Sequence, residues 1–324
     1  MALDIFELFK TWRQQIKSLN ENKTVIVSCS GGSDSVALLH LLSMFFQQED
    51  LCQKLAVLHF NYGLRQEESD RDERFVAQLA KEKNINFFSY DVKKNHIRSV
   101  EDKDSTQVWA RNIRYQVYQK HIDNGCVVAV AHTQDDVAEN AILRMARGTS
   151  PGSLRGMSTW HKDVWRPVLH LSKASLLGWL EEKKLSFCLD SSNLSCDYSR
   201  NLIRHEVLPL LENLYPGAKR RIAGFALESQ DLTRALMEGS IEDGASCLSI
   251  SKIKLQNPIL ARNIIARFLR SRCAPRQVVL SRQKLKVILE NVLAANKSTF
   301  WKMQVSSQYF LCISRGEIFV QENT

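Results

Sequence analysis

A glycine- and serine-rich hexapeptide separates a strand-like run from a helix-like run near the amino end of this chain. Residues 24–29 are mostly apolar, and residues 36–42 carry apolar side chains at helical spacing. Between the two runs stand Ser30, Gly31, Gly32, Ser33, Asp34 and Ser35. Glycine lets the backbone approach a ligand closely, and a helix N-terminus offers unpaired N–H groups to an anion. The hexapeptide therefore predicts a phosphate-binding turn.

Asp34 is unusual in such a turn, because a carboxylate repels phosphate. A divalent cation between the two groups removes the conflict, so we assign Asp34 to such a cation. No lysine follows the glycines, which excludes a Walker A loop. The alternative is an ordinary turn that caps a helix, but the complete hexapeptide directly after a strand favours the phosphate site.

The first half of the chain alternates strand and helix patterns. Strand-like runs cover residues 25–28, 55–60, 87–92 and 127–131, and helical patterns cover residues 34–46, 67–83 and 105–122. This alternation predicts an α/β fold with a doubly wound, mostly parallel sheet. Ligands bind such sheets at the carboxyl ends of the strands. The hexapeptide, residues 59–65 and residues 131–136 all follow predicted strands.

Further patterns divide the chain into three parts. We expect an amphipathic helix within residues 1–17, a helix capped by Ser172, a helix that ends near residue 215, and a long helix over residues 218–237. Residues 93–104 and 148–159 are expected to form loops. The predicted domains are a nucleotide-binding domain at residues 1–215, a helical linker at 216–243 and a small basic α+β domain at 244–324.

Charge is unevenly distributed along the chain. The net charge is +9, and residues 244–324 hold 13 of the 44 basic but only 3 of the 35 acidic residues. A basic domain joined to a neutral one favours a polyanionic partner, most simply nucleic acid, over a domain made basic for solubility. We assign Arg262, Arg267 and Arg270 to phosphate contacts in that domain. We expect the apolar residues at 259–260, 264–265 and 268–269 to pack in its core, together with Trp301, Tyr309 and Phe310.

The remaining composition excludes two classes of protein. No apolar run approaches the roughly 20 residues that a membrane-spanning helix needs. The eight cysteines include no C-x-x-C pair, so they predict neither a zinc site nor a disulfide framework. We expect a cytoplasmic protein without membrane contact. The oligomeric state stays open, with a homodimer among the alternatives.

Five sequence blocks in order resemble one enzyme family. They are the hexapeptide and residues 59–65, 110–115, 131–139 (continued by 147–148 and 152–157), and 190–193 followed by 200–209. The hexapeptide is similar to the PP-loop of the N-type ATP pyrophosphatases, which cleave ATP between the α and β phosphates. All five blocks together resemble the tRNA(Ile)-lysidine synthetase family, over about residues 25–211 and more weakly over 248–320. The chain looks like a short form that lacks the family's last C-terminal domain.

The resemblance implies a ligase that forms a C–N bond. ATP would adenylate O2 of the wobble cytidine in a tRNA(Ile) with a CAU anticodon, and free L-lysine would displace AMP to give lysidine. The implied cofactors are ATP and Mg²⁺. Two alternatives are a PP-loop enzyme that thiolates a tRNA pyrimidine, against which the missing cysteine pair counts, and a non-catalytic tRNA-binding protein.

The family blocks also imply roles for single residues. Asp136 and Glu139 are three apart on one helix face and are candidates to bind the lysine amine and take its proton, although Asp136 could equally bind Mg²⁺ beside Asp34. His132 would contact the adenylate or the lysine. The alternative is that Asp135 and Asp136 cap a helix and that Glu139 is a first-turn carboxylate.

Basic residues in the same blocks are candidates for phosphate and tRNA contacts. Arg111 is assigned to the nucleotide and Arg114 to the tRNA, with salt bridges inside the fold as the alternative. Arg200, Asn201 and Arg204 share one helix face and are assigned to the tRNA, with simple solvation of the surface as the alternative.

Overall fold

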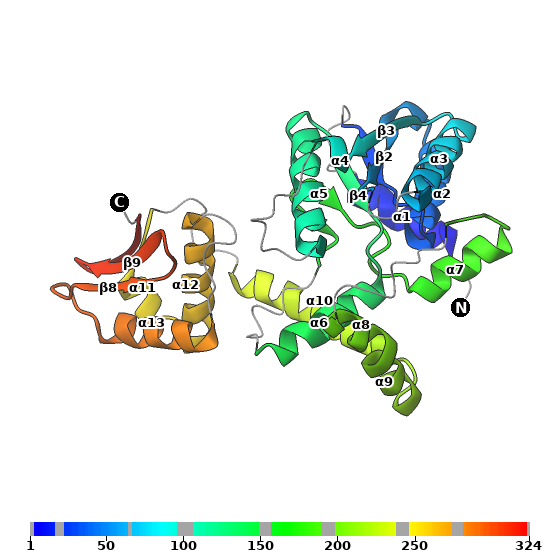
Figure 1. Cartoon of the computed structure of the whole chain (residues 1–324). Helices are drawn as coiled ribbons and strands as arrows, with labels where there is room; N and C mark the ends of the chain where they lie inside the picture. Colours follow the sequence, from blue (N-terminus) through cyan, green and yellow to red (C-terminus); the bar gives the residue numbers. More distant parts are fainter. Residues whose placement is uncertain are drawn as a thin grey trace. The chain divides into compact units, whose positions relative to one another are not determined.

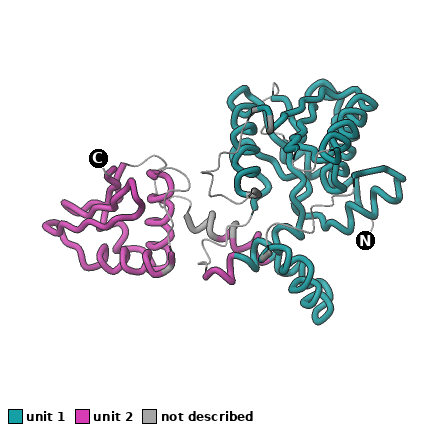
Figure 2. Tube along the Cα trace, viewed as in Figure 1, with its two compact units in different colours: residues 1–143, 157–224 teal, residues 144–156, 225–324 magenta. Residues whose placement is uncertain are grey.

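A computed structural model describes residues 3–16, 23–63, 67–95, 106–148, 157–188, 198–237, 246–273 and 281–322. The chain forms two compact units, residues 1–143 with 157–224 and residues 144–156 with 225–324 (Figure 2). Most of the two expected loops, at residues 93–104 and 148–159, lies outside the described residues. The division into domains at residues 215 and 243 stays a prediction.

The first unit is built on a six-stranded sheet with the order β3-β2-β1-β4-β6-β5. The strands are β1 (Val25–Ser28), β2 (Leu55–Asn61), β3 (Asn86–Asp91), β4 (Val127–Val130), β5 (Trp160–His161) and β6 (Val164–Trp165). All neighbouring pairs are parallel except β5 and β6. In the register, Val25 of β1 lies opposite Leu55 of β2 and Val127 of β4.

Helices follow the strands along the chain. They are α1 (Ile5–Ile16), α2 (Ser33–Gln48), α3 (Glu67–Glu82), α4 (Val92–Asn95), α5 (Thr106–Asp123), α6 (Gln134–Ala146), α7 (Lys173–Glu182), α8 (Tyr198–Leu202), α9 (Leu208–Leu214) and α10 (Ala218–Met237). A 3₁₀ turn covers Cys52–Lys54, and a π-helical segment covers Ile203–Val207. Figure 1 shows α2, α3 and α5 beside the labelled strands, whereas α8 and α9 lie farther from them.

Alternate side chains of each central strand face two different hydrophobic layers. Val25 and Val27 pack with residues of α1, α2, α3 and α7, whereas Ile26 packs with residues of α5. Trp12 of α1 is fully buried in the first layer, and its Nε1 donates a hydrogen bond to the Pro167 carbonyl at 3.0 Å. The sheet is therefore covered on both faces, which confirms the predicted α/β fold class.

The strand order reverses between β1 and β4. The chain runs outward from β1 through β2 to β3 and then returns to place β4 on the other side of β1. Loops that leave the carboxyl ends of two such strands diverge and open a crevice, where open α/β sheets bind their ligands. The hexapeptide follows β1, and His132 to Asp136 follow β4, so both flank this crevice.

The second unit pairs an antiparallel sheet with helices. The sheet has the order β7-β10-β9-β8 and consists of β7 (Cys247–Ser249), β8 (Trp301–Gln304), β9 (Tyr309–Ser314) and β10 (Glu317–Glu322). Its helices are α11 (Ile250–Lys254), α12 (Pro258–Arg272) and α13 (Arg282–Ala294). Ile264, Ile265 and Phe268 of α12 are buried in the core of this unit.

Two expectations for this unit were wrong. Ile259, expected in the core, is 57% exposed, because it lies in the first turn of α12, next to the N-cap Asn257. Phe310 was expected to pack in the core with Tyr309, but neighbouring strand residues point to opposite faces. Tyr309 packs on the core, whereas the Phe310 ring has the Lys302 Nζ 4.1 Å from its centre.

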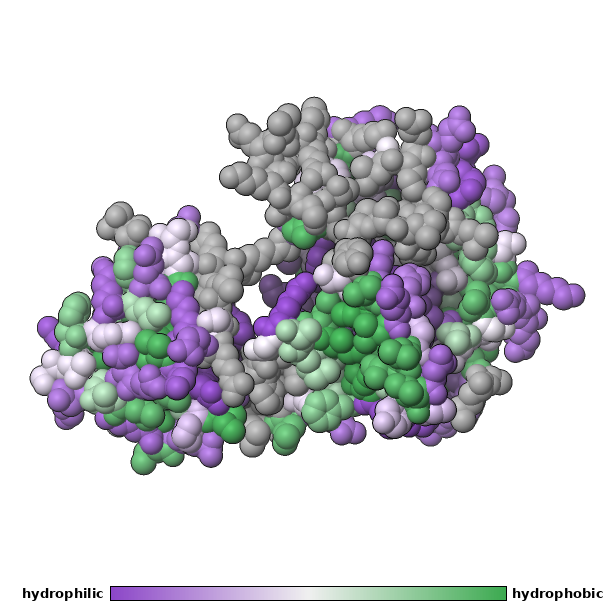
Figure 3. Space-filling model, turned by 60° about the horizontal axis from the view of Figure 1, so that its bottom comes forward, coloured by the Kyte–Doolittle hydropathy of each residue, from purple (hydrophilic) through white to green (hydrophobic). Residues whose placement is uncertain are grey.

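Apolar side chains are also exposed on the surface. Leu210 and Leu214 of α9, with the adjoining Tyr215, are more than half exposed. Figure 3 shows hydrophobic residues gathered in one area of the face turned forward, bordered by hydrophilic residues. In the described parts of the chain, none of the helices combines the length and the apolar character needed to cross a bilayer.

Candidate active site

Two of the three serine hydroxyls of the hexapeptide, those of Ser30 and Ser35, form hydrogen bonds across its bend. Ser35 Oγ donates to the Gly32 carbonyl at 2.9 Å and accepts from the Ser30 N–H at 3.1 Å. The Ser30 and Ser35 hydroxyls also lie 3.1 Å apart. Gly32 precedes α2 in an extended conformation and makes no side-chain cap within the described residues. The first-turn N–H groups of α2 can therefore face an anion at the end of β1.

Gly31 takes a conformation that other residues rarely adopt. Its φ is +94°, and a Cβ at this position would lie 3.4 Å from Cys188 Sγ. The Gly31 carbonyl also accepts a hydrogen bond from the Cys188 N–H at 2.9 Å. The bend therefore requires glycine here, for its positive φ and for the close approach of Cys188.

Asp34 lies in the first turn of α2 and faces a lysine from another helix. Lys173 Nζ, at the start of α7, is 3.2 Å from Asp34 Oδ2. Burial raises the pKa of Asp34 above its ordinary value, and the Lys173 charge offsets part of that rise. Asp136 adds to the rise by like-charge repulsion, so the two carboxylates share one electrostatic environment.

Asp136 is buried and accepts several hydrogen bonds. Its Oδ2 accepts from the Thr133 N–H at 2.9 Å and the Thr133 hydroxyl at 3.0 Å, and its Oδ1 lies 3.2 Å from Arg200 Nη2. Burial by itself would raise the pKa of Asp136. Lys173, His132 and the Thr133 N–H outweigh burial and hold the pKa below its ordinary value. Asp136 therefore both caps the start of α6 and presents a charge to the site.

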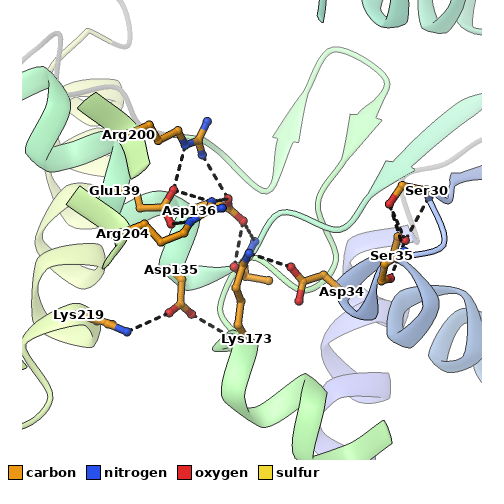
Figure 4. A network of polar contacts seen from close by, with 12 residues as sticks. Ser30, Asp34, Ser35, Asp135, Asp136, Glu139, Lys173, Arg200, Arg204 and Lys219 are labelled. Atoms are coloured by element: carbon orange, nitrogen blue, oxygen red, sulfur yellow. Dashed lines mark hydrogen bonds and ion pairs between the residues drawn. The ribbon is translucent and has the colours of Figure 1, made fainter. Parts of the chain in front are cut away.

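Glu139 is the most enclosed carboxylate of this cluster, with a side chain only 1% exposed. Arg200 Nε donates to its Oε2 at 2.9 Å, and Arg204 donates through Nε to Oε1 at 2.6 Å and through Nη2 to Oε2 at 2.9 Å. Figure 4 shows both guanidinium groups directed at Glu139 and Asp136. A carboxylate this buried needs such partners to remain charged.

Asp135 fixes the start of α7. Its Oδ2 accepts the backbone N–H of Lys173 at 2.8 Å, and its Oδ1 lies 3.7 Å from Lys219 Nζ. Asp135 therefore caps a helix, as the alternative interpretation of the sequence proposed. The helix that it caps is the distant α7, however, and not α6, in which Asp135 lies. This hydrogen bond fixes the position of the Lys173 backbone, from which the side chain extends toward Asp34.

His132 is placed to donate a hydrogen bond into the site. Burial, with a smaller contribution from Arg166, lowers its pKa to about 4, so the ring is neutral near pH 7. Its Nδ1 accepts a hydrogen bond from Arg166 Nε at 3.1 Å. A neutral imidazole that accepts at Nδ1 carries its proton on Nε2. Nε2 can then donate to an oxygen of a ligand, but it cannot take up a proton.

The other candidate residues lie in three places. Arg111 of α5 is exposed, with its guanidinium 4.8 Å from the centre of the Tyr115 ring, and Arg114 is also exposed. Both lower the pKa of His132 electrostatically, so α5 borders the site. Asn201 is half-buried on α8. Arg262, Arg267 and Arg270 lie on α12 of the second unit. The assigned roles of these residues, and of Arg200 and Arg204, stay predictions.

The sequence patterns missed four residues that the fold adds to the site: Thr133, Arg166, Lys173 and Lys219. Only one had a usable signal. Ser172 is the N-cap of α7, accepting the Ser175 N–H at 3.1 Å as expected, so Lys173 could have been placed at the start of that helix. Its contact with Asp34 could not have been found, because it depends on how α7 packs against α2.

The carboxylates of the site fit Mg²⁺ bound together with phosphate. Within the described residues, no group of three or more His, Cys, Asp or Glu side chains could hold a metal by itself. Mg²⁺ is usually held by one or two carboxylates with substrate phosphates and water, not by a full protein cage. Asp34, beside the phosphate-binding turn, and Asp136 offer such a partial set.

A comparison with protein families decides the classification, since the family model of the PP-loop domain matches residues 7–211. The chain belongs to the PP-loop domain family. Its hexapeptide is the PP-loop, which confirms the resemblance expected from the sequence.

Two relatives of this chain carry the same name. The tRNA(Ile)-lysidine synthase of Parabacteroides distasonis is 36% identical over 213 residues, which are 65% of this chain and 47% of that protein. The tRNA(Ile)-lysidine synthase of Petrotoga mobilis is 29% identical over 272 residues, 82% of this chain and 85% of that protein. The PP-loop chain spans about half the length of the first three such relatives.

A solved structure supports the fold alone. The U34-tRNA thiolase NcsA from Methanococcus maripaludis, with its [4Fe-4S] cluster, superposes with a TM-score of 0.55 at 19% sequence identity. The match covers 70% of this chain and 78% of the thiolase.

Proposed function

We propose that this PP-loop protein ligates free L-lysine to C2 of the wobble cytidine in a tRNA(Ile) with a CAU anticodon, using ATP. The observation that carries the proposal is the Asp136–Glu139 pair, which is buried, charge-compensated and placed near Asp34 of the PP-loop. A PP-loop accounts for the use of ATP, and a buried pair of carboxylates accounts for a cationic second substrate. The name shared by the relatives supports lysine as that substrate.

The PP-loop end of the site would receive the pyrophosphate part of ATP. Its first-turn N–H groups and the Ser30 and Ser35 hydroxyls would bind phosphate oxygens while O2 of the cytidine attacks the α-phosphorus. Asp34 and Asp136 would hold Mg²⁺, which when bound neutralises charge on the leaving pyrophosphate. His132 would donate its Nε2 proton in a hydrogen bond to an oxygen of the adenylate.

The other end of the site would bind the amino acid. Free lysine carries an α-carboxylate and two ammonium groups, so it needs both signs of charge in its site. Asp136 and Glu139 would bind an ammonium group, and Arg200 and Arg204 already point at the same position and could bind the α-carboxylate (Figure 4). The cluster thus offers complementary charges to a zwitterion.

The attacking amine must lose its proton. The ε-amino group has a reference pKa of about 10.4, so it is almost fully protonated at pH 7. Its pKa falls as the bond to C2 forms, and Asp136 or Glu139 would then accept the proton. His132 does not serve as this base, since its Nδ1 is occupied by Arg166 and its Nε2 carries a hydrogen.

The tRNA would be bound mainly through charge. The arginines of α12 in the basic second unit would contact the tRNA backbone, and Arg111 and Arg114 would contact phosphates near the site. Since tRNA is the substrate, we place the enzyme in the cytoplasm.

A single assay tests the proposal. The protein is incubated with ATP, Mg²⁺, radiolabelled lysine and a tRNA(Ile) transcript with a CAU anticodon. We expect label in the tRNA, with release of AMP and pyrophosphate, and no label when the wobble cytidine is replaced by uridine. Absence of label with the cytidine transcript, while ATP is bound, would contradict lysine ligation.

The same assay with a sulfur donor tests thiolation. Thiolation by a cysteine persulfide needs a reactive thiolate. Cys188, beside the PP-loop, is a poor one, because burial and the neighbouring Asp72 raise its pKa to about 12. We therefore expect no sulfur in the tRNA. Incorporation of sulfur would show that the protein is a thiolation enzyme and would contradict the proposed ligation.

A further inference from the structure

The PP-loop of this chain contains no lysine, yet the fold brings one to it. Lys173 lies at the first position of α7, and its ammonium reaches Asp34 in the first turn of α2. In the Walker A loop, a lysine of the motif itself reaches the β and γ phosphates. Here the equivalent charge comes from a separate helix.

The base of the Lys173 side chain is held firmly. Its backbone N–H donates to Asp135 Oδ2 at 2.8 Å, and Ser172 caps the same helix end. Helix α7 also packs against α2, the helix that begins at the PP-loop. The side chain itself is 37% exposed, so its ammonium remains accessible to a ligand.

The ammonium of Lys173 stands between two carboxylates that repel each other. Figure 4 shows Lys173 reaching from α7 into the space between Asp34 and Asp136. Lys173 lowers the pKa of both carboxylates, whereas Asp136 raises that of Asp34. Lys173 thus supplies the positive charge that a divalent cation would bring to the same pair.

We propose that Lys173 is the phosphate-binding lysine of this PP-loop, held by Asp34 in the free protein and transferred to a pyrophosphate oxygen when a divalent cation binds Asp34. The proposal rests on the use of ATP in the proposed function. It makes Lys173 a direct contact of the leaving pyrophosphate. The competing explanation is a structural one, in which Lys173 only ties α7 to α2.

Binding of inorganic pyrophosphate tests the proposal without turnover. Calorimetry is carried out in MgCl₂ on the full chain and on Lys173→Met, Lys173→Arg and Lys23→Met. We expect Lys173→Met to weaken pyrophosphate binding about 10- to 100-fold, since the variant cannot form the charged hydrogen bond. Lys173→Arg should keep most of the affinity. Lys23→Met is the matched control, because Lys23 is a partly exposed lysine that pairs with Asp163 outside the site.

Binding of Mn²⁺ in the absence of phosphate distinguishes the two explanations. It can be followed by electron paramagnetic resonance. If Lys173 competes with the cation for Asp34, Lys173→Met should bind Mn²⁺ more tightly, by about fivefold or more, although it binds pyrophosphate more weakly. If Lys173 only ties α7 to α2, Lys173→Met should bind both Mn²⁺ and pyrophosphate more weakly, or both as well as the unmodified chain. Either result would overturn the proposal.

The controls keep this inference separate from the proposed function. Failure of the unmodified chain to bind ATP or pyrophosphate would refute the use of ATP and with it both proposals. Normal binding by the unmodified chain with unchanged binding by Lys173→Met would refute the role of Lys173 alone. Circular dichroism shows whether Lys173→Met is folded. If it is not, Lys173→Arg tests the role of the charge instead. Loss of pyrophosphate binding by a folded Lys173→Arg variant would contradict a charge contact.

Discussion

Arg204 donates two hydrogen bonds to the carboxylate of Glu139, from Nε to Oε1 at 2.6 Å and from Nη2 to Oε2 at 2.9 Å. The glutamate is almost completely buried, whereas Arg204 is a quarter exposed. A contact of this geometry fixes the orientation of the carboxylate as well as its charge. The Glu139 end of the site is therefore held in one arrangement by its own ion pairs.

Glu139→Gln should impair both folding and lysine binding. Removing one partner of a buried ion pair leaves uncompensated charge, so we expect a loss of about 2–4 kcal/mol in the free energy of unfolding. The KM for lysine should rise more than that for ATP. Glu49→Gln is the control, because Glu49 pairs with Arg13 at 2.7 Å outside the site and is a quarter exposed. Glu49→Gln should lower the free energy of unfolding by less than about 1 kcal/mol and leave the KM values for lysine and ATP unchanged. Equal effects in the two variants would contradict a substrate role for Glu139.

Asp34→Asn should abolish turnover without unfolding the protein. The neutral amide has nearly the same shape, but it cannot hold a divalent cation beside the PP-loop, so we expect a loss of about 10³-fold or more in turnover. ATP–pyrophosphate exchange and a thermal melt measure the two effects. Asp163→Asn, which breaks a 2.6 Å pair with Lys23 away from the site, is the control and should keep full exchange. Retained exchange in Asp34→Asn would remove Asp34 from the mechanism.

Gly31→Ala should distort the PP-loop. The added Cβ meets Cys188 Sγ, and φ of +94° strains any L-residue, so we expect about 1–2 kcal/mol of destabilisation and weaker ATP binding. Gly178 is the opposite case, since a Cβ there would meet nothing within 4 Å and the residue lies inside α7. Gly178→Ala should stabilise the protein by about 0.5–1 kcal/mol. Chemical denaturation compares the two, and a stable Gly31→Ala variant with normal ATP binding would contradict the constraint on Gly31.

Stability should fall as the pH drops below neutrality, and His40 should cause part of that fall. Burial, with help from Lys83, lowers the pKa of His40 from 6.5 to about 4. Between these values the unfolded chain takes up a proton that the folded chain does not, so the free energy of unfolding decreases as pH falls. From pH 7 to 5 we expect His40 to account for a loss of about 1–2 kcal/mol.

Denaturant titrations of His40→Asn at pH 7 and 5 check this contribution. The variant should show a smaller difference between the two pH values than the unmodified protein. His205, which is exposed, is the matched control, and His205→Asn should leave the difference as it was. A difference that is identical in all three proteins would show that His40 is not the titrating group.

The arginines of α12 should control the salt dependence of tRNA binding. In a variant with Gln at positions 262, 267 and 270, we expect the slope of log K against log salt to fall by about one unit for each phosphate that the protein no longer neutralises. Lys286→Gln on α13 is the control, because Lys286 forms a pair with Glu290. Filter binding at several salt concentrations measures both slopes. A triple variant with an unchanged slope would place the tRNA-binding surface elsewhere.

The strands, the helices and the PP-loop could be predicted from the sequence because each depends on neighbouring residues. Apolar runs of four to seven residues became β1, β2 and β4, and Gly31 and Gly32 marked the bend after β1. Helix α7 was predictable in the same way, from Ser172 at its N-cap. The errors also have local causes. Ile259 was placed in the core by its residue type, although it lies in the first turn of its helix.

The tertiary structure decided which charged residues of the site pair with one another. The sequence by itself placed a glycine- and serine-rich turn after β1, Asp136 and Glu139 on one helix face, and basic residues near position 200. Packing decided that Lys173 reaches Asp34, that Asp135 caps a distant helix, and that Arg200 and Arg204 close on Glu139. These pairs join segments far apart along the chain, and charge attraction alone does not select a partner. The sheet and its helices bring particular charges within 3–4 Å, where burial makes the pairing strong.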